Sequence, residues 1–238
     1  MKRILFMIFR NIFIFPYLYI KLVILGKGEK YTEEQRYRHI RKITEHANKG
    51  GRVVIECYGA ENLPAENGYM LYPNHQGMYD VLTIIATHEK PFSVVMKKEL
   101  QNIFMLDKVF IGLRALAIDR EDIRQSMEVI KETARQVSEG RNFLIFAEGT
   151  RSKQGNTVGE FKGGSFKAAY KARCPIVPVA LVDAYVPFDI PSIKKVTVKV
   201  EYLKPIPYEK YKDMKTTELA KMVQEQIQRA INSHIEQK

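Results

Sequence analysis

An imidazole and a carboxylate stand five positions apart in "YPNHQGMYD", residues 72–80, just after an apolar segment. Five residues around an ideal helix would point the side chains of His75 and Asp80 far apart, so they meet only if His75 lies in a turn that Gly77 permits. A neutral imidazole held by a carboxylate can remove a proton from an alcohol that attacks an acyl carbon. The equally weighted alternative is a solvated turn histidine followed by Asp80 as a helix N-cap.

A second stretch with chemical potential is "RALAIDRED", which ends a predicted strand with an aspartate and an arginine. An arginine at the start of a helix, beside unpaired backbone N–H groups, is well suited to hold a phosphate. A surface ion pair of Arg120 with Asp119 or Glu121 explains the pattern equally well.

The third stretch, "FLIFAEGTRSKQG", runs from an apolar strand into a turn that crowds a carboxylate, hydroxyls and a guanidinium together. These groups belong to Glu148, Thr150, Arg151 and Ser152. A little further on, "GEFKGGSF" adds Lys162 and a glycine pair that opens the next helix, a second potential anion cradle. The chain lacks the GxxxxGK[ST] pattern of nucleotide-binding P-loops, so ATP hydrolysis has no support. Cys57 and Cys174 are interpreted as inert residues of buried strands, and no metal-binding spacing occurs.

The elements that must position these residues alternate along the chain from Arg52 onward. Strands are predicted at 52–59, 68–73, 91–97, 114–120, 141–148, 175–182 and 194–205, and helices at 81–88, 99–112, 121–140, 163–173 and from about Thr216. This alternation predicts an α/β fold with a mostly parallel central sheet flanked by helices. In such sheets, ligands bind at the loops that follow strand ends, and the three stretches above fall there.

The N-terminal end is both apolar and basic. Of the chain's formal net charge of +11, the first 50 residues contribute 11 Lys and Arg against 4 Asp and Glu. Residues 1–28 contain two apolar runs separated by Arg10 and Asn11, with Pro16 as the expected kink, and residues 32–51 form a predicted amphipathic helix. We expect residues 1–50 to be membrane-associating helices, with basic side chains reaching anionic lipid, and residues 51–238 to be the main domain. Residues 1–28 could either span the bilayer or lie in its interface, and both arrangements stay open. A buried core helix is the less favoured alternative.

Taken together, the stretches resemble the 1-acylglycerol-3-phosphate acyltransferases, the PlsC-type family. The family's blocks occur in order as "NHQGMYD", "RALAIDR", "FAEGTRS" and "PIVPVAL", over a motif core at about residues 70–185, and "MKKEL" matches a further K-x-E-L block. Three positions depart from the family pattern: Gly77 replaces a common serine, Arg114 a usual glycine, and a proline that is common near Phe104 is absent. These changes affect the expected acceptor preference and leave the reaction intact.

The resemblance implies acyl transfer from acyl-CoA or acyl-carrier protein to the sn-2 hydroxyl of lysophosphatidic acid, which gives phosphatidic acid without a covalent acyl-enzyme, cofactor or metal. It implies His75 as general base and Asp80 as its orienting partner. Residues expected to bind the acceptor phosphate are Arg120, Arg151 and Lys97, with Lys162 as a further candidate. Glu148, Gly149 and Thr150 are expected to position the substrate.

Two alternatives stay open beside this interpretation. The same fold could act on glycerol-3-phosphate or another lysophospholipid. A non-catalytic basic protein that binds membranes or nucleic acid is disfavoured, because the excess charge belongs mainly to the lipid-seeking end. We expect a membrane lipid partner, no nucleic acid, and a location at the cytoplasmic face of the cell membrane through the N-terminal helices. The sequence does not predict the oligomeric state.

Overall fold

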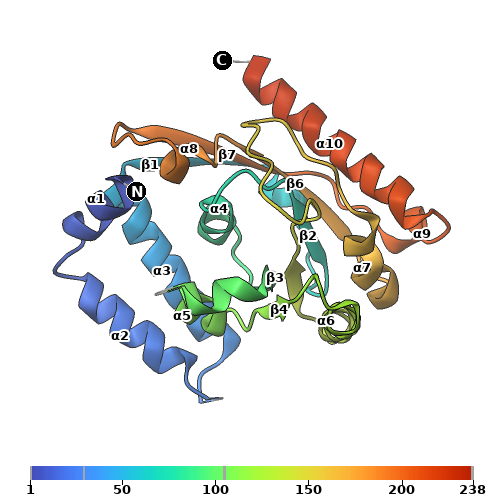
Figure 1. The fold of residues 1–238 in the computed structure, drawn as a ribbon, viewed down its shortest axis with the longest axis horizontal. Helices are drawn as coiled ribbons and strands as arrows, with labels where there is room; N and C mark the ends of the chain where they lie inside the picture. The colour runs from blue at the N-terminus through green and yellow to red at the C-terminus, as the bar shows by residue number, and fades with distance from the viewer. Residues whose placement is uncertain (1, 29, 104–105, 237–238) are drawn as a thin grey trace.

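Seven strands form one sheet in the order β1–β7–β6–β2–β5–β3–β4 (Figure 1). The structure is a computed structural model, and it describes residues 2–28, 30–103 and 106–236. The strands are Val53–Tyr58 (β1), Met70–Pro73 (β2), Phe92–Lys97 (β3), Leu116–Ile118 (β4), Asn142–Leu144 (β5), Ile176–Val182 (β6) and Val196–Tyr202 (β7). Every neighbouring pair is parallel except β6 with β7. The prediction of a mostly parallel α/β sheet flanked by helices is therefore confirmed.

Helices cover both faces of the sheet (Figure 1). The α-helices are Lys2–Arg10 (α1), Phe15–Gly26 (α2), Glu33–Gly51 (α3), Asp80–Thr87 (α4), Leu106–Gly112 (α5), Ile123–Ser138 (α6), Lys167–Ala172 (α7), Val186–Asp189 (α8), Tyr208–Tyr211 (α9) and Thr216–Glu236 (α10). Short 3₁₀ helices are Ala60–Asn62 (η1), Lys98–Asn102 (η2) and Gly163–Phe166 (η3). The predicted helix at 99–112 is thus divided into η2 and α5, and residues 104–105 between them lie outside the described residues.

Successive side chains along β2 point to opposite faces of the sheet and pack against different helices. Met70 and Tyr72 enter a cluster with side chains of α6, α7 and α10, whereas Tyr69 and Leu71 enter a cluster with side chains of α1 to α4. All four residues are fully buried. A strand covered on both faces has no polar side, which explains why the sequence of β2 is apolar throughout.

The strands predicted at 114–120 and 141–148 keep only three residues each in the structure, as β4 and β5, because the chain leaves the sheet early at both places. After β4, the side chain of Gln125 on α6 accepts from the N–H of Asp119 at 2.8 Å and donates to the carbonyl of Ala117 at 2.8 Å. After β5, the chain turns at Gly149, whose φ of +76° is a left-handed conformation that glycine adopts without strain. These departures release Arg120 and Glu148 from the sheet.

The N-terminal segment forms two helices, α1 and α2, with their axes bent by 96°. Pro16 lies in the first turn of α2, where its missing N–H costs nothing, so it begins a helix instead of kinking one. Met7, Leu18 and Leu22 are buried, whereas Phe9 and Phe13 are exposed. No single helix in the described part of the chain has the length and hydropathy needed to cross a membrane, although α1 and α2 meet the criterion as a bent pair.

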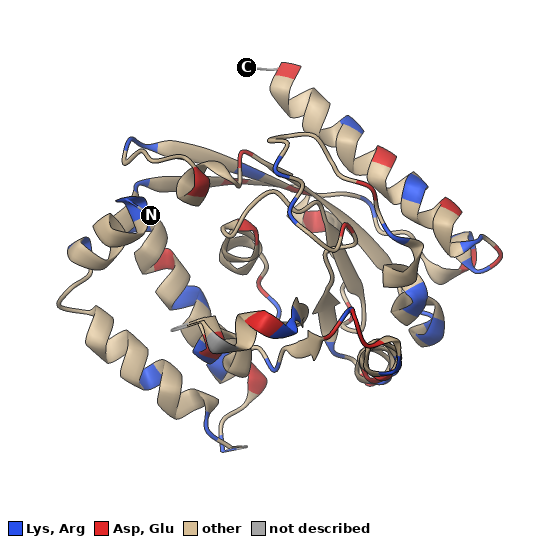
Figure 2. Ribbon diagram, in the orientation of Figure 1, with Lys and Arg blue, Asp and Glu red and all other residues tan. Residues whose placement is uncertain are grey.

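Two expectations are corrected here: not every basic side chain of the N-terminal helices reaches outward, and Cys57 on β1 is not buried. Arg3 does not reach outward: it is 1% exposed, and its guanidinium donates to the carbonyls of Pro187 at 3.1 Å, Gly51 at 2.5 Å and Lys194 at 2.9 Å. Cys57 is exposed, because β1 is an edge strand, while Cys174 is buried as expected. The other Lys and Arg residues of the segment lie along α3, near the helix ends and, for Lys21, in the middle of α2, whereas α10 carries both signs of charge (Figure 2).

Candidate active site

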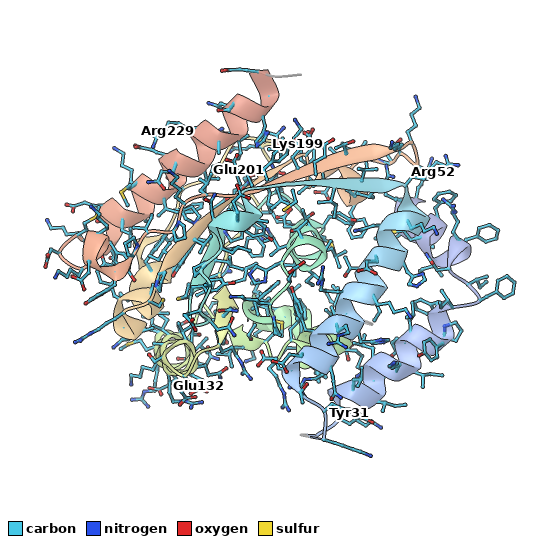
Figure 3. All side chains as sticks on the ribbon, turned by 180° about the vertical axis from the view of Figure 1, so that it is seen from behind. Tyr31, Arg52, Glu132, Lys199, Glu201 and Arg229 are labelled. Carbon is cyan, nitrogen blue, oxygen red and sulfur yellow. The ribbon has the colours of Figure 1, made fainter. Side chains whose placement is uncertain are left out.

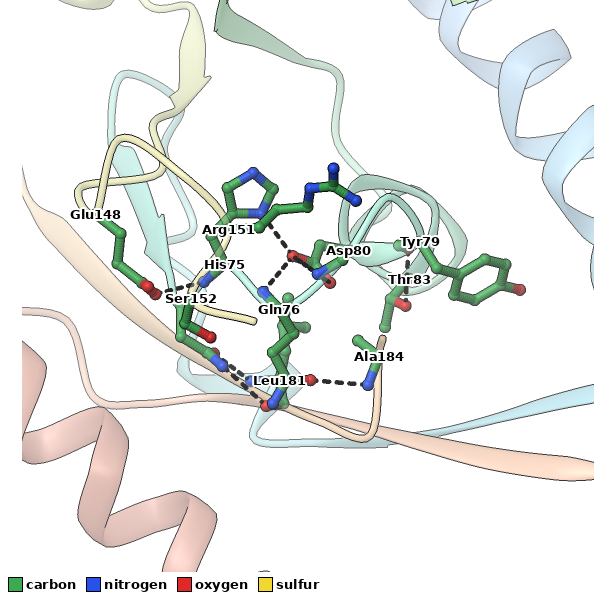
Figure 4. A network of polar contacts seen from close by, with 12 residues as sticks. His75, Gln76, Tyr79, Asp80, Thr83, Glu148, Arg151, Ser152, Leu181 and Ala184 are labelled. Carbon is green, nitrogen blue, oxygen red and sulfur yellow. Dashed lines mark hydrogen bonds and ion pairs between the residues drawn. The ribbon is translucent and has the colours of Figure 1, made fainter. Parts of the chain in front are cut away.

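The loop between β2 and α4 brings His75 and Asp80 into contact. Nδ1 of His75 lies 2.7 Å from Oδ2 of Asp80, and the same carboxylate accepts from the N–H groups of Gln76 at 2.7 Å and Gly77 at 3.0 Å (Figure 4). The N-cap alternative is wrong, because Asp80 bonds to the loop before α4 and the cap position is Tyr79, which has no side-chain cap bond. The loop therefore folds back as the catalytic interpretation required.

The Asp80 contacts define the protonation of the pair. Asp80 is fully buried, and burial raises the pKa of its carboxyl, while the bonds from His75, Gly77 and Gln76 oppose that shift. The backbone N–H groups of Gln76 and Gly77 can only donate, which favours the ionised form of the carboxylate. Nδ1 of His75 then carries the proton, and in the neutral ring Nε2 holds the free lone pair. The His75 side chain is 21% exposed, so a substrate can approach it.

Gly77 serves a different purpose from the one predicted. Its φ angle lies outside the left-handed region, so the turn does not demand glycine for its dihedral angles. A Cβ at this position would lie 2.9 Å from the Cα of Tyr185, at the start of α8. Any side chain would therefore push α8 away from the loop, and glycine is needed for this close approach.

Two buried amides that the sequence analysis missed fix the loop on either side of His75. Asn74 accepts from the N–H of Leu181 at 2.8 Å and donates to its carbonyl at 3.1 Å. Gln76 accepts from the N–H of Ala184 at 2.8 Å (Figure 4). In the sequence, the signal for this role is that two amide side chains follow directly after an apolar strand. Buried amides at such a position must bond to protein groups instead of water. Together they lock the loop against the end of β6.

Glu148 holds the backbone of the His75 loop from the β5 side. Its Oε1 accepts from the N–H of His75 at 2.6 Å, and its Oε2 accepts from the N–H of Gly159 at 3.1 Å. Burial raises the pKa of Glu148, which is 4% exposed, and the two N–H bonds and the His75 ring oppose this shift. The N–H of Ser152 donates to the carbonyl of His75 at 2.8 Å, and the ring of Phe146 stacks on the imidazole at a centroid distance of 3.9 Å. The "FAEGTRS" loop thus fixes both the backbone and the ring of His75.

Cationic side chains gather beside this pair. Figure 4 shows the Arg151 side chain extending toward His75 and Asp80, and its Nη1 lies 3.9 Å from Oδ1 of Asp189 on α8. A Cβ built on Gly149 would lie 3.6 Å from the Arg120 guanidinium and 3.7 Å from Cδ of Lys162. Arg120 and Lys162 therefore converge on the turn that precedes Arg151.

The remaining predicted residues lie further along the same strand ends. Lys97 forms an ion pair with Glu99 at 2.8 Å, and its side chain is half exposed. Partial burial lowers the pKa of Arg120, and the charge of Glu99 opposes this shift. Thr150 is exposed on the turn. The N–H of Gly149 donates to the carbonyl of Phe146 at 3.1 Å, so it is engaged within the turn itself.

The arrangement joins a base to a cluster of fixed positive charges. A neutral imidazole with a free Nε2 can accept a proton from a hydroxyl, and guanidinium and ammonium groups can hold a phosphate nearby. Within the described part of the chain, no group of three or more His, Cys, Asp or Glu side chains is arranged to hold a metal ion. The geometry defines an α/β protein with a His–Asp pair beside a group of cationic side chains at the carboxyl ends of its strands.

Comparison with known families gives this class a name. The family model described as Acyltransferase matches residues 54–182, more than half of the chain, so the chain belongs to the acyltransferase family. A 1-acyl-sn-glycerol-3-phosphate acyltransferase of Borreliella burgdorferi is 33% identical over 131 residues, which are 55% of this chain and 52% of that protein. The corresponding enzyme of Escherichia coli is 29% identical over 70% of this chain and 68% of its own length.

A solved structure shows that the similarity of fold covers nearly the whole chain. The crystal structure of the 1-acyl-sn-glycerophosphate acyltransferase PlsC of Thermotoga maritima superposes with a TM-score of 0.78 at 20% identity, over 98% of this chain and 95% of that one. The match with the Borreliella burgdorferi protein and a 31% identical match with a probable 1-acyl-sn-glycerol-3-phosphate acyltransferase of Mycoplasma pneumoniae span only 52% and 59% of those relatives. The shared fold therefore includes the N-terminal helices, while the sequence similarity concentrates around the motif core.

Proposed function

We propose that the protein transfers an acyl chain to the sn-2 hydroxyl of 1-acylglycerol-3-phosphate and so makes phosphatidic acid. The observation that carries this proposal is the 2.7 Å contact between His75 and Asp80 beside the cations around Gly149 and Arg151. An alcohol-activating base next to a phosphate pocket suits an acceptor that carries both a hydroxyl and a phosphate. The names of the relatives support the same substrate class.

The proposed reaction is a single acyl transfer between two bound substrates. Nε2 of His75 takes the proton of the acceptor hydroxyl while the oxygen attacks the thioester carbonyl of acyl-CoA or acyl-carrier protein. The carbon–sulfur bond then breaks, and the imidazolium returns its proton to the departing thiolate. Holding both substrates in this orientation removes much of the entropic barrier of their encounter. No cofactor takes part, and no acyl group is bound to the protein.

Each site residue receives a role that its contacts permit. The acceptor phosphate is bound by Arg120, Arg151 and Lys162. Lys97 also binds it, once its ion pair with Glu99 has been replaced by one with the phosphate. Asp80 keeps the imidazole in the productive tautomer. Glu148 positions the His75 loop instead of bonding the glycerol, because both of its oxygens are engaged by backbone N–H groups. Thr150 remains a candidate for contact with the glycerol, and the engaged N–H of Gly149 is not assigned to the oxyanion.

We further propose that α1 and α2 hold the protein on the cytoplasmic face of the cell membrane. Their outward side chains form an apolar surface, and the exposed large residues are Leu5, Ile8, Phe9, Ile12, Phe13, Tyr17, Ile20 and Ile24. An apolar surface of this kind, with basic residues nearby, favours the interface of an anionic bilayer. The substrates carry lipid tails, so this location would bring them to the enzyme.

The acceptor is tested with the purified full chain in neutral detergent micelles and a radiolabelled acyl donor. The assay compares 1-acylglycerol-3-phosphate with glycerol-3-phosphate and lysophosphatidylcholine, using acyl-CoA and acyl-carrier protein in parallel. We expect labelled phosphatidic acid from 1-acylglycerol-3-phosphate at the highest rate. Transfer to glycerol-3-phosphate at a higher rate would replace the proposed acceptor, and transfer to none of them would refute the proposed activity.

A further inference from the structure

A large cavity lies away from the catalytic loops, beside the edge strand β4. Its volume is about 870 Å³, and it lies between the start of α3, α5 and the C-terminal end of α6. In Figure 3, which views the molecule from behind, Tyr31 marks the start of α3 and Glu132 lies on α6. Ligand pockets commonly measure about 300–1,000 Å³, so the cavity is of a suitable size for a small molecule. None of the residues proposed above for catalysis or phosphate binding lines it.

The chain topology separates the arginines of this cavity from the loops that carry His75 and Arg151, while Met96 of the lining adjoins Lys97. Arg114 and Arg141, which line the cavity, precede β4 and β5. His75 and Arg151 follow β2 and β5, and these strands are parallel to one another. The cavity arginines therefore lie at the amino ends of the strands, whereas the catalytic loops lie at the carboxyl ends.

Three arginines share the cavity, and the deepest of them lacks a full set of partners. Arg36 is only 5% exposed, and its Nε is buried without a hydrogen bond to any described residue. Its Nη1 donates to the carbonyl of Tyr31. Burial lowers the pKa of Arg36, and the neighbouring Arg114 and Arg141 lower it further, against the effects of Glu33 and Glu34. A buried guanidinium that its neighbours repel is costly unless an anion compensates it.

The acidic residues of the lining are already engaged. Oε2 of Glu33 accepts from Arg141 at 3.2 Å, and Asp107 forms an ion pair with Lys108 at 2.7 Å. Arg114 donates from Nη2 to the carbonyl of Gly28 at 3.1 Å, which uses one of its donors. Arg141 donates from Nε and Nη2 to Glu33 and from Nη1 to Oε1 of Gln136 at 2.6 Å, which leaves one further N–H on each Nη. The remaining guanidinium donors of Arg114 and Arg141 therefore lie near Arg36, which has no ion pair with a described carboxylate.

Part of the cavity lining is apolar and adjoins the end of α2. Met96, Phe110, Ile111 and Leu116 form this apolar wall. A Cβ on Gly26, the last residue of α2, would lie 3.2 Å from Cγ2 of Ile111, so the wall adjoins the end of that helix. Ile111 is 47% exposed, as is Ile24 on α2. A ligand bound here would meet both positive charge and apolar surface.

We infer that this cavity is a second anion site, which binds a phosphate monoester with its oxygens against Arg36, Arg114 and Arg141. Guanidinium groups bind phosphate through paired, charge-assisted hydrogen bonds, and this is the donor set that the cavity offers. The apolar wall favours a lipid as the carrier of the phosphate, with its chains toward Phe110 and Ile111. The site is separate from acyl transfer and does not depend on the proposed function.

Arg114 permits a test that leaves the backbone unstrained. Its φ is +53°, a conformation that glycine adopts freely, so Arg114→Gly removes the guanidinium without backbone strain. Arg173 provides a matched control, because it is exposed at the end of α7 and has a φ of +52°. Arg173→Gly therefore makes the same change of charge and side chain in the same backbone conformation, away from the cavity.

The experiment titrates the full chain, in neutral detergent micelles without an acyl donor, by calorimetry. Both variants are made in an Arg151→Gln background, which weakens the proposed catalytic phosphate site. The probes are phosphatidic acid, phosphatidylcholine with the same chains, and inorganic phosphate. We expect saturable binding of phosphatidic acid in Arg151→Gln alone and with Arg173→Gly, and an affinity about ten-fold or more weaker with Arg114→Gly.

The outcomes separate the two sources of phosphate and the two proposals. Binding of phosphatidic acid alone identifies a lipid ligand, and binding of inorganic phosphate as well shows that the phosphate group suffices; both support the site. Equal affinity in the Arg114→Gly and Arg173→Gly variants, or no saturable binding in either, overturns it. The acyl-transfer assay is separate, so an inactive parent protein would refute the proposed function without affecting this titration.

Discussion

The carboxylate of Glu148 accepts a hydrogen bond from the backbone N–H of His75 at 2.6 Å, while Asp80 contacts the imidazole of the same residue at 2.7 Å. Two carboxylates thus hold one histidine in different ways. Asp80 orients the ring, and Glu148 fixes the loop that carries it. Mutations of the two should therefore have different consequences.

Glu148→Gln should lower both stability and turnover. The new amide N–H₂ would face the N–H of His75 or Gly159, and a buried donor without an acceptor costs about 1–3 kcal/mol. We expect a lower free energy of unfolding and a lower kcat, with KM for the acceptor unchanged within about two-fold. Urea unfolding and steady-state kinetics measure these quantities, with the exposed Glu160→Gln as control. A raised KM at the parental kcat would instead assign Glu148 to the acceptor.

Arg151→Gln should weaken binding of the acceptor phosphate. Hydrogen bonds to charged groups contribute about 1.5–3 kcal/mol, which corresponds to roughly a ten-fold or greater rise in KM for 1-acylglycerol-3-phosphate. KM for the acyl donor should stay close to the parental value. The exposed Arg173→Gln provides the control for loss of one positive charge. Equal changes in both KM values would argue against a role for Arg151 at the phosphate.

Polar replacement of exposed side chains on α1 and α2 should release the protein from membranes. Phe9, Phe13 and Ile20 are 71%, 99% and 58% exposed, so changing all three to serine removes apolar surface without opening the core. Deletion of residues 1–28 would be less clear, because it would also remove the buried Met7 and Leu22.

The measurement is sedimentation with anionic vesicles, combined with thermal unfolding of the variant in solution. We expect the triple variant to move to the supernatant at an unchanged Tm, whereas Ile235→Ser on α10 should sediment like the parent. Full retention of the triple variant on vesicles would remove the proposed membrane role of this surface.

Much of this architecture could be predicted because it depends on local patterns. The alternation of strands with helices predicted the sheet, whereas the spacing of His75 and Asp80 left the folded-back turn and the N-cap alternative equally open. The capping box of Thr32 and Gln35 begins α3 where the sequence indicated. Each of these features is encoded within a few consecutive residues.

The features that were missed depend on contacts between distant parts of the chain. Asn74 and Gln76 bond to Leu181 and Ala184, more than 100 residues away. The basic side chains of the N-terminal helices were expected to reach lipid, yet the carbonyl partners of Arg3 include Pro187 and Lys194. Arg114 adopts a φ of +53°, which explains why glycine is the usual residue there in the resembling family. Neither these distant partners nor the backbone conformation of Arg114 can be identified from the pattern of one segment.

Acid should destabilise the fold through His88. This residue is fully buried, and burial lowers its pKa from 6.5 to about 4. Its Nδ1 lies 2.6 Å from the carbonyl of Lys90, and its Nε2 lies 2.7 Å from the Tyr69 hydroxyl, which suits a neutral ring. Between these two pKa values the unfolded chain binds more protons than the folded one. Stability from this group is therefore complete above pH 6.5 and declines as the pH falls toward 4.

The expected loss across this range is about 3 kcal/mol in the free energy of unfolding. Urea unfolding at several pH values between 4 and 7 measures it, and His88→Gln should show a shallower decline than the parent. The same dependence on pH in both proteins would show that another group is responsible.

The most direct test of the central claim is the single-turnover rate of acyl transfer in His75→Gln with both substrates saturating. The claim is that Nε2 of His75 takes the acceptor proton, so removing the base should lower the rate by roughly 10²- to 10⁴-fold. Tm and vesicle binding should match those of the parent, which would exclude misfolding as the cause. Transfer at the parental rate by a folded His75→Gln protein would contradict the account.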